Sequence, residues 1–329
     1  MIKSVLPFAL GLAGVVAPSA ASATTVSTEI QASGPHGMQG PLAGTFVAPS
    51  NSRATVLIIP GSGPTNRDGN SPLGVKASMY RQLAEGLARQ HIGSVRIDKR
   101  GMFGSAKAVP DANAVTVDDY VQDTFSWIAT IRAKTGGRCV WLLGHSEGGL
   151  MALATAARHP ESVCGLILVS TAGRALGDVI SEQLHANPAN GTLADAGDVA
   201  IRELVQGHRV EVSTLPPPLV PLFNPAVQGF LISLFAQDPT QLIARVRVPV
   251  LIVQGERDLQ VGTVDAQRLK QAHPTATLAL LPDVNHVLKT VTSDDRAANI
   301  QTYGDATLPI APSVVDAIAK FIDANPAPN

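Results

Sequence analysis

The most informative stretch of this chain reads Val140-Trp141-Leu142-Leu143-Gly144-His145-Ser146-Glu147-Gly148-Gly149. It begins as an apolar run typical of a buried parallel strand and ends in the pattern Gly-x-Ser-x-Gly. A strand, this pattern and a following helix predict a nucleophile elbow, a tight and strained turn that exposes the serine. Gly144 and Gly148 are needed there because a Cβ at either position would crowd the turn. The residues after the turn are small, which suits close packing: Gly149, Ala152, Ala154, Ala156 and Ala157.

Strand-like and helix-like segments alternate through most of the chain. Apolar or β-branched runs predict strands over residues 25–32, 41–48, 54–59, 94–97, 163–170, 248–255 and 277–281. Apolar residues at helical spacing predict helices over residues 80–88, 117–133, 264–271 and 314–322. This alternation indicates an α/β protein, with a mostly parallel, doubly wound sheet covered by helices on both faces.

The alternation of strands and helices stops over residues 174–244, where short helix-like pieces flank a proline-rich run at 215–221. This segment follows the sixth predicted strand and is long for a connector. We therefore predict a helical cap or lid at 174–244, inserted into a core formed by residues 24–173 and 245–329. The apolar part of the insertion, residues 219–235, could line an acyl pocket or only pack the cap onto the core, and the sequence leaves both open.

The N-terminus has the three regions of a secretory signal peptide. Lys3 supplies a positive charge, residues 5–17 are apolar, and an Ala-x-Ala site ends at Ala23. We predict cleavage after Ala23 and a periplasmic or secreted protein. The apolar run is too short to remain as a spanning helix, so no integral membrane segment is expected in the mature chain. The 329 residues carry a formal net charge of −1, which gives no electrostatic case for nucleic acid as a partner.

Cys139 and Cys164 are the two cysteines of the chain, and each lies at the start of a predicted strand. If the two strands are neighbours, the thiols could form a disulfide in an oxidising compartment. Two buried thiols acting as small apolar side chains are the alternative. The sequence does not decide between them.

A serine nucleophile needs a base, and the base needs a partner that fixes its tautomer. Downstream of an elbow serine, these groups follow in the order Asp or Glu, then His. Asp258 and His286 follow successive predicted strands in that order, at the strand ends where open α/β sheets bind ligands. We predict Ser146 as nucleophile, His286 as general base and acid, and Asp258 as the orienting carboxylate. Glu256 is a weaker alternative partner, and Asp283 is better explained as part of a turn.

An acyl-transfer serine also needs donors for the developing oxyanion. The backbone N–H of Glu147 is the first expected donor. The second is expected from the glycine-rich loop after residues 54–59, at Ser62 or Gly63, with Ser62 favoured. The loop residues Asn66, Arg67, Asp68 and Asn70 are expected to brace it. The sequence has no cluster with metal-ligand spacing and no dinucleotide or phosphate motif, so neither a metal nor a cofactor is expected.

Five motifs together resemble a group of exported α/β-hydrolases, related to esterases and to proteins labelled serine aminopeptidase or dienelactone hydrolase. They are Pro-Gly-Ser-Gly-Pro-Thr-Asn-Arg-Asp-Gly-Asn at 60–70, Asp-Lys-Arg-Gly at 98–101, Gly-His-Ser-Glu-Gly-Gly at 144–149, Gly-Glu-Arg-Asp at 255–258 and Asn-His-Val-Leu-Lys at 285–289. The resemblance implies hydrolysis of carboxylic esters through an acyl-enzyme, with Ser146, Asp258 and His286 carried over. Residues 102–106 depart from the Gly-x-Gly-x-Ser often found in the superfamily, which concerns only the shape of that loop.

These observations favour a carboxylesterase that acts on small or medium uncharged acyl esters, with a small-molecule ester as its substrate. An aminopeptidase or amidase on the same three residues is an alternative. It would need an acidic group to hold the substrate amine, and Glu182 or Glu203 in the cap could supply one. A ligand-binding protein on a hydrolase scaffold is a third reading.

Overall fold

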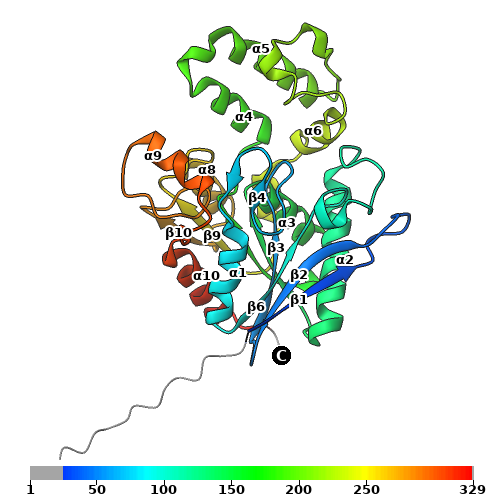
Figure 1. Ribbon diagram of the computed structural model, residues 1–329, viewed down its shortest axis with the longest axis vertical. Coiled ribbons are helices and arrows are strands. Elements are labelled where there is room, and N and C mark those ends of the chain that lie inside the picture. Colours follow the sequence, from blue (N-terminus) through cyan, green and yellow to red (C-terminus); the bar gives the residue numbers. More distant parts are fainter. Residues whose placement is uncertain (1–24, 328–329) are drawn as a thin grey trace, which may run out of the picture.

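The computed structural model describes residues 25–327, so the predicted signal peptide over residues 1–23 lies outside the described residues. An eight-stranded sheet forms the centre of the molecule (Figure 1). In spatial order its strands are β1 (Thr25–Ala32), β2 (Leu42–Pro49), β6 (Ile92–Ile97), β3 (Ala54–Ile59), β7 (Val140–His145), β8 (Val163–Val169), β9 (Val250–Gly255) and β10 (Thr277–Leu281). The six strands from β6 to β10 pair in parallel, while β1 and β2 are antiparallel. The mostly parallel sheet predicted from the sequence is confirmed.

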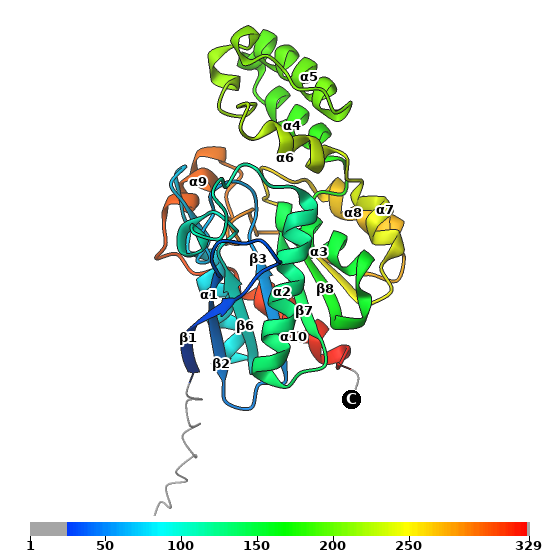
Figure 2. The same cartoon turned by 90° about the vertical axis from the view of Figure 1, so that its right-hand side faces the viewer.

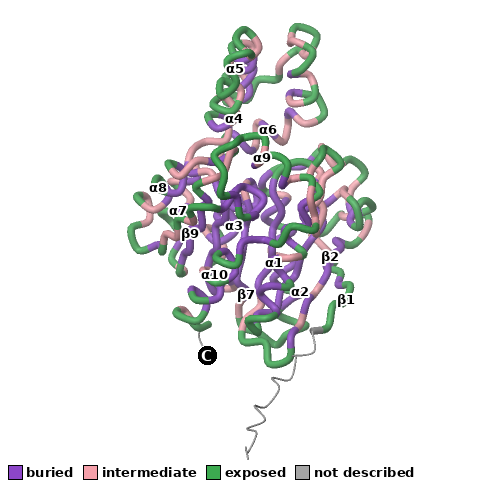
Figure 3. The backbone as a smooth tube through the Cα atoms, turned by 60° about the vertical axis from the view of Figure 1, so that its left-hand side comes forward, coloured by how far each residue is buried: buried purple, intermediate pink, exposed green. Residues whose placement is uncertain are grey.

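Helices cover both faces of this sheet (Figure 2). Successive residues of a strand point to opposite faces. In β3, Leu57 belongs to the same apolar cluster as residues of α2 (Val117–Thr135), α3 (Glu147–Arg158) and α8 (Thr263–Ala272). The next residue, Ile58, packs with residues of α1 (Met79–Arg89) and α10 (Pro312–Ala324). The central strands β3, β7, β8 and β9 are consequently buried on both sides (Figure 3), which explains their apolar runs, while the edge strands β1 and β10 are partly exposed.

The ends of α2 are set by local hydrogen bonds. The Thr116 hydroxyl accepts a hydrogen bond from the Asp119 N–H, and the Asp119 carboxylate accepts one from the Thr116 N–H. This capping box satisfies two donors that have no partner inside the helix. At the other end, Gly136 adopts φ 72°, a left-handed conformation that favours glycine. The start at Val117 agrees with the helix predicted over residues 117–133, and the helix continues two residues further, to Thr135.

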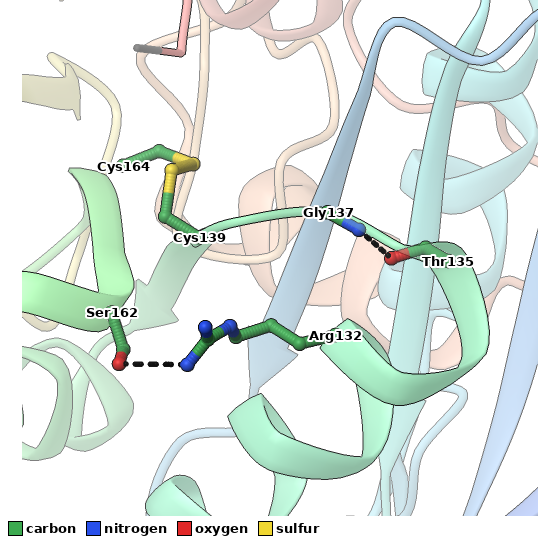
Figure 4. Close-up of a disulfide and its surroundings, with 6 residues drawn as sticks. All are labelled: Arg132, Thr135, Gly137, Cys139, Ser162 and Cys164. Carbon is green, nitrogen blue, oxygen red and sulfur yellow. Dashed lines mark hydrogen bonds between the residues drawn. A yellow bond between two sulfur atoms is a disulfide. The ribbon is translucent and has the colours of Figure 1, made fainter. Parts of the chain in front are cut away.

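A disulfide joins Cys139 and Cys164 (Figure 4), with their Cα atoms 5.1 Å apart. Cys139 directly precedes β7, and Cys164 lies in β8, the strand that pairs with it. The adjacency of the two strands, which the sequence left open, is what brings the sulfurs together. The bond lies at the amino ends of both strands, opposite the end that leads into Ser146.

Residues 174–244 form helices, and those over residues 176–235 lie above the carboxyl ends of the strands, at the top of Figure 1. They follow β8, the sixth strand of the sheet in chain order, as predicted. The helices are α4 (Leu176–His185), α5 (Gly191–Val205), α6 (Gln228–Phe235) and α7 (Pro239–Arg245). The last of these, α7, was not predicted and packs against α3 and α8 of the core.

Three small elements outside the main sheet were also not predicted. Two-residue strands β4 (Asn70–Ser71) and β5 (Val75–Lys76) form a hairpin, and α9 (Arg296–Gln301) follows the loop after β10. Among the helices of residues 25–327, none is long and apolar enough to cross a bilayer.

Candidate active site

Ser146 lies at the turn between β7 and α3, where the sequence predicted an elbow. Its backbone has φ 55° and ψ −122°, a region that non-glycine residues rarely occupy. The turn is closely packed on both sides of the serine. A Cβ added to Gly144 would overlap the carbonyl oxygen of Gly148, and one added to Gly148 would overlap that of Ile59. Only glycine fits at these two positions, as the motif requires.

His286 and Asp258 come together at the carboxyl ends of β9 and β10. The Nδ1 of His286 lies 2.8 Å from Oδ2 of Asp258, and both side chains are almost wholly buried. Asp258 Oδ1 accepts hydrogen bonds from the N–H groups of Gln260 and Val261. Burial raises the pKa of Asp258, but the neighbouring His286 and these donors outweigh it and hold the pKa below its usual value. Asp258 is therefore an ionised carboxylate, in position to accept a hydrogen bond from the protonated Nδ1 of His286.

The two other carboxylates considered as partners of His286 do not hold this position. Glu256 and Asp283 are both exposed, and the carboxylate that accepts the hydrogen bond of His286 is that of Asp258. Ser146 makes no side-chain hydrogen bond to His286 in the described structure, and such bonds often tighten only when substrate is bound.

His145, the residue before the serine, links three parts of the site. Its Nε2 lies 2.9 Å from the backbone carbonyl oxygen of His286, so this nitrogen carries a hydrogen and donates it. Its Nδ1, 2.9 Å from Oη of Tyr80, then accepts the phenol hydrogen. Tyr80 Oη in turn accepts a hydrogen bond from the N–H of Gly61. Burial, and then the nearby His286, lower the pKa of His145 to about 3, which keeps the imidazole neutral.

The predicted oxyanion donors surround the serine. Glu147 begins α3, and its N–H is one of the first in the helix, which have no acceptor within the helix itself. Ser62 and Gly63 line the same cavity as Ser146 and Glu147. The preceding residue, Gly61, lies against the serine: a Cβ added to it would be 3.3 Å from the Ser146 Cβ. Because Gly61 already donates its N–H to Tyr80, the loop donors that can face a substrate follow it in the chain.

The loop over residues 60–70 is braced as the sequence predicted. Asn66 Oδ1 accepts hydrogen bonds from the N–H groups of Asp68 and Asn70. Arg67 Nε donates to Asp98 Oδ2 at 2.9 Å. Asp68 forms an ion pair with Arg96, whose side chain is buried. These bonds fix the far end of the loop to the sheet, so its near end is held beside the serine.

A buried ion pair, not foreseen from the sequence, lies next to the nucleophile. Lys99 Nζ is 3.7 Å from Oε1 of Glu147, and both side chains are at most 7% exposed. The same ammonium group donates a hydrogen bond of 2.7 Å to the Gly61 carbonyl. Burial lowers the pKa of Lys99 and raises that of Glu147, and the charge of each opposes the shift of the other. The side chain of Glu147 therefore points to a lysine, while its backbone N–H stays beside the serine.

A cavity of about 700 Å³ opens beside Ser146, between the core and the cap. Its walls are mostly apolar, and the cap contributes Phe230, Leu231 and Leu234 from α6. Its volume lies within the range of sites that bind small molecules. At its edge, Arg174 makes two hydrogen bonds to Asp265 of α8, 2.9 Å and 2.7 Å long, and pairs with Glu182 of α4. The sequence left open whether residues 219–235 line a pocket or only pack the cap onto the core. In the structure this segment does both.

The acidic residues considered for binding a substrate amine are engaged elsewhere. Glu182 pairs with Arg174, and Glu203 lies 3.2 Å from Nδ1 of His208 on the cap surface. Within residues 25–327, no group of three or more His, Cys, Asp and Glu side chains could hold a metal ion.

Comparisons with known proteins agree with this architecture. The sequence model of the family described as serine aminopeptidase, S33, matches residues 72–213. Esterase EstD of Thermotoga maritima is 26% identical over 71% of this chain, which spans only 54% of that relative's length. A pimeloyl-[acyl-carrier protein] methyl ester esterase of Chromobacterium violaceum is 25% identical over 65% of this chain and 84% of its own. The solved structure of the Pyrococcus furiosus esterase Pf2001 superposes with a TM-score of 0.56 at 15% identity, covering 92% of this chain and 91% of that one. A likeness at this identity shows a shared fold.

Proposed function

We propose that this chain, which has an α/β-hydrolase fold, cleaves carboxylic esters through an acyl-enzyme formed on Ser146. The hydrogen bond between His286 Nδ1 and Asp258 Oδ2, together with a serine on a strained elbow, is the observation that carries the proposal. The relatives named as esterases support the same chemistry, since each of their names specifies an ester substrate.

The reaction follows from the roles of the three side chains. Because Nδ1 of His286 is held by a carboxylate, Nε2 is free to take the Ser146 proton as the oxygen attacks the ester carbon. The N–H groups of Glu147 and Ser62 stabilise the negative oxygen that forms. When the C–O bond of the ester breaks, His286 returns the proton to the leaving alcohol. A water molecule then repeats these steps and releases the carboxylic acid and the free enzyme.

The cavity supports an uncharged acyl group of small or medium size. Apolar side chains from the core and from α6 line it beside Ser146, and they would favour a hydrocarbon chain over a charged one. The test is a panel of p-nitrophenyl esters of increasing acyl length, run beside aminoacyl-naphthylamides. Hydrolysis of the amides in preference to all the esters would favour the aminopeptidase reading instead.

A binding protein on the same scaffold would behave differently. A fluorophosphonate should label Ser146 covalently in an active serine hydrolase. Failure of the intact protein to react, together with no ester turnover, would contradict the proposed activity.

The proposal includes export, with cleavage after Ala23, so that the mature chain begins at Thr24. The Cys139–Cys164 disulfide supports an oxidising compartment. N-terminal sequencing of the protein recovered from the periplasm or medium tests it. A mature protein that keeps Met1 or stays in the cytoplasm would contradict export.

A further inference from the structure

Gly61 is held at both of its backbone groups by buried side chains. Its N–H is donated to Tyr80 Oη at 2.9 Å, and its carbonyl oxygen accepts the hydrogen bond of 2.7 Å from Lys99 Nζ. Gly61 also lies against Ser146, as the 3.3 Å approach described above shows. The position of this residue therefore depends on two side chains from other segments, α1 and the end of β6.

The carbonyl contact also fixes the next N–H in the chain. The peptide unit between Gly61 and Ser62 is planar and trans, so its carbonyl oxygen and its N–H point in opposite directions. A group that holds the Gly61 oxygen thereby sets the direction of the Ser62 N–H. Donors of an oxyanion hole contribute most when they are fixed before the reaction begins.

Lys99 reaches the second donor as well. Its ammonium group forms the ion pair with the side chain of Glu147, the residue whose N–H is the other proposed donor. The face of the Tyr120 ring lies 5.9 Å from the same nitrogen. Lys99 thus connects the loop after β3 with the first residue of α3. Burying a lysine costs free energy, and an apolar pair of similar volume often stabilises a fold equally well, so stability alone does not account for this pair.

We propose that Lys99 is a positioning residue of the oxyanion hole: it holds the Gly61 carbonyl so that the Ser62 N–H is aimed at the substrate, and its ion pair ties that loop to Glu147. The proposal rests on the ester hydrolysis proposed above. Lys99 acts through the backbone and does not need to touch the substrate.

The test compares wild type with Lys99→Met and with the double variant Lys99→Met/Glu147→Gln. The double variant leaves no unpaired buried charge, so it keeps the test valid if the single variant fails to fold. Loss of a whole oxyanion donor lowers kcat by about 10²–10³-fold. For a misaimed donor we expect kcat to fall about 10-fold to 100-fold in the double variant, with KM within about threefold of wild type. Binding of a trifluoromethyl ketone, which forms an oxyanion on Ser146, should weaken by the same factor as kcat/KM.

The neighbouring pair of Arg100 and Asp123 provides the matched control. This pair is equally buried, with 2.6 Å between Arg100 Nη2 and Asp123 Oδ1. It joins the segment after β6, which also carries Lys99, to α2 and not to Gly61. Arg100→Met/Asp123→Asn should lower the melting temperature, while the ketone affinity stays at the wild-type value and kcat changes by less than about threefold.

Two outcomes would overturn the proposal. One is a folded Lys99→Met/Glu147→Gln variant with wild-type kcat and wild-type ketone affinity. The other is a loss confined to KM, which would make Lys99 a substrate-binding group. If wild type itself neither hydrolyses esters nor reacts with a fluorophosphonate, the proposed function fails, and this result is distinct from both.

Discussion

The imidazole of His145 donates a hydrogen bond from Nε2 to the backbone carbonyl of His286, 2.9 Å away. The residue before the nucleophile thereby holds the loop that carries the proposed base. The other ring nitrogen accepts from Tyr80, which holds Gly61. One neutral imidazole therefore links the serine turn, the loop after β10 and the loop after β3.

Burial of this imidazole makes the stability of the fold depend on pH. The folded-state pKa of His145, about 3, lies below the ordinary value of 6.5, so the contribution is fully present above pH 6.5 and is lost as pH falls toward 3. Between pH 7 and pH 5 the loss from this one group should be about 2 kcal/mol. We expect the unfolding free energy of His145→Gln, whose amide can donate and accept but not titrate, to fall less with acid than that of wild type. Denaturant titrations at the two pH values measure it.

His208→Gln, on the exposed cap surface, is the control and should follow wild type. An equal acid dependence in wild type and His145→Gln would show that the buried imidazole does not set it.

Ser146→Ala should reduce kcat for p-nitrophenyl esters by on the order of 10⁴ or more, because no other side chain can form the acyl-enzyme. The circular dichroism spectrum and melting temperature should match wild type. Ser126→Ala, on the surface of α2, controls for removing a serine hydroxyl. Turnover that survives in Ser146→Ala would place the chemistry on another residue.

Asp258→Asn should lower kcat by about 10⁴-fold with little change in KM, because an amide no longer stabilises the tautomer and the charge of His286. Glu256→Gln and Asp283→Asn are matched controls from the same two loops. Both carboxylates are exposed, so these variants should keep near wild-type rates. A large loss in either control, with Asp258→Asn active, would reverse the assignment.

Replacing both cysteines, as Cys139→Ala/Cys164→Ala, should lower the unfolding free energy by about 3 kcal/mol, the size expected when a loop of this length is no longer closed. kcat should stay within about twofold of wild type, because the disulfide lies at the end of the strands away from Ser146. Urea titration with a parallel ester assay checks both. A wild-type protein whose thiols react fully without reductant would contradict the bond.

The sequence predicted the central strands β3, β7, β8 and β9 because they contain apolar runs that are buried on both faces, and such runs need no tertiary information to recognise. The prediction for β3, for example, matches residue for residue. The elements that were missed are short or depend on distant contacts. Strands β4 and β5 have two residues each, too few for a period, and α7 is stabilised by packing on α3 and α8.

The same division applies to the site. Ser146, Asp258 and His286 could be proposed from motifs and strand ends, since each follows a recognisable strand. The contacts of Lys99 and Tyr80 with Gly61 could not, because they join residues 38 and 19 positions apart across different elements. The disulfide was undecidable for a similar reason, since it required knowing that β7 and β8 are neighbours.

The helices α4 to α6 leave the sheet after β8 and return to β9, and these two strands pair with each other. The inserted segment thus begins and ends at two neighbouring strands and contributes no strand to the sheet. A different set of helices could replace α4 to α6 between β8 and β9 without altering the strand order of the sheet or the serine turn. A chimaera that keeps residues 25–173 and 239–327, so that α7 stays packed on α3 and α8, would replace the helices above the cavity and leave the sheet and the serine turn in place.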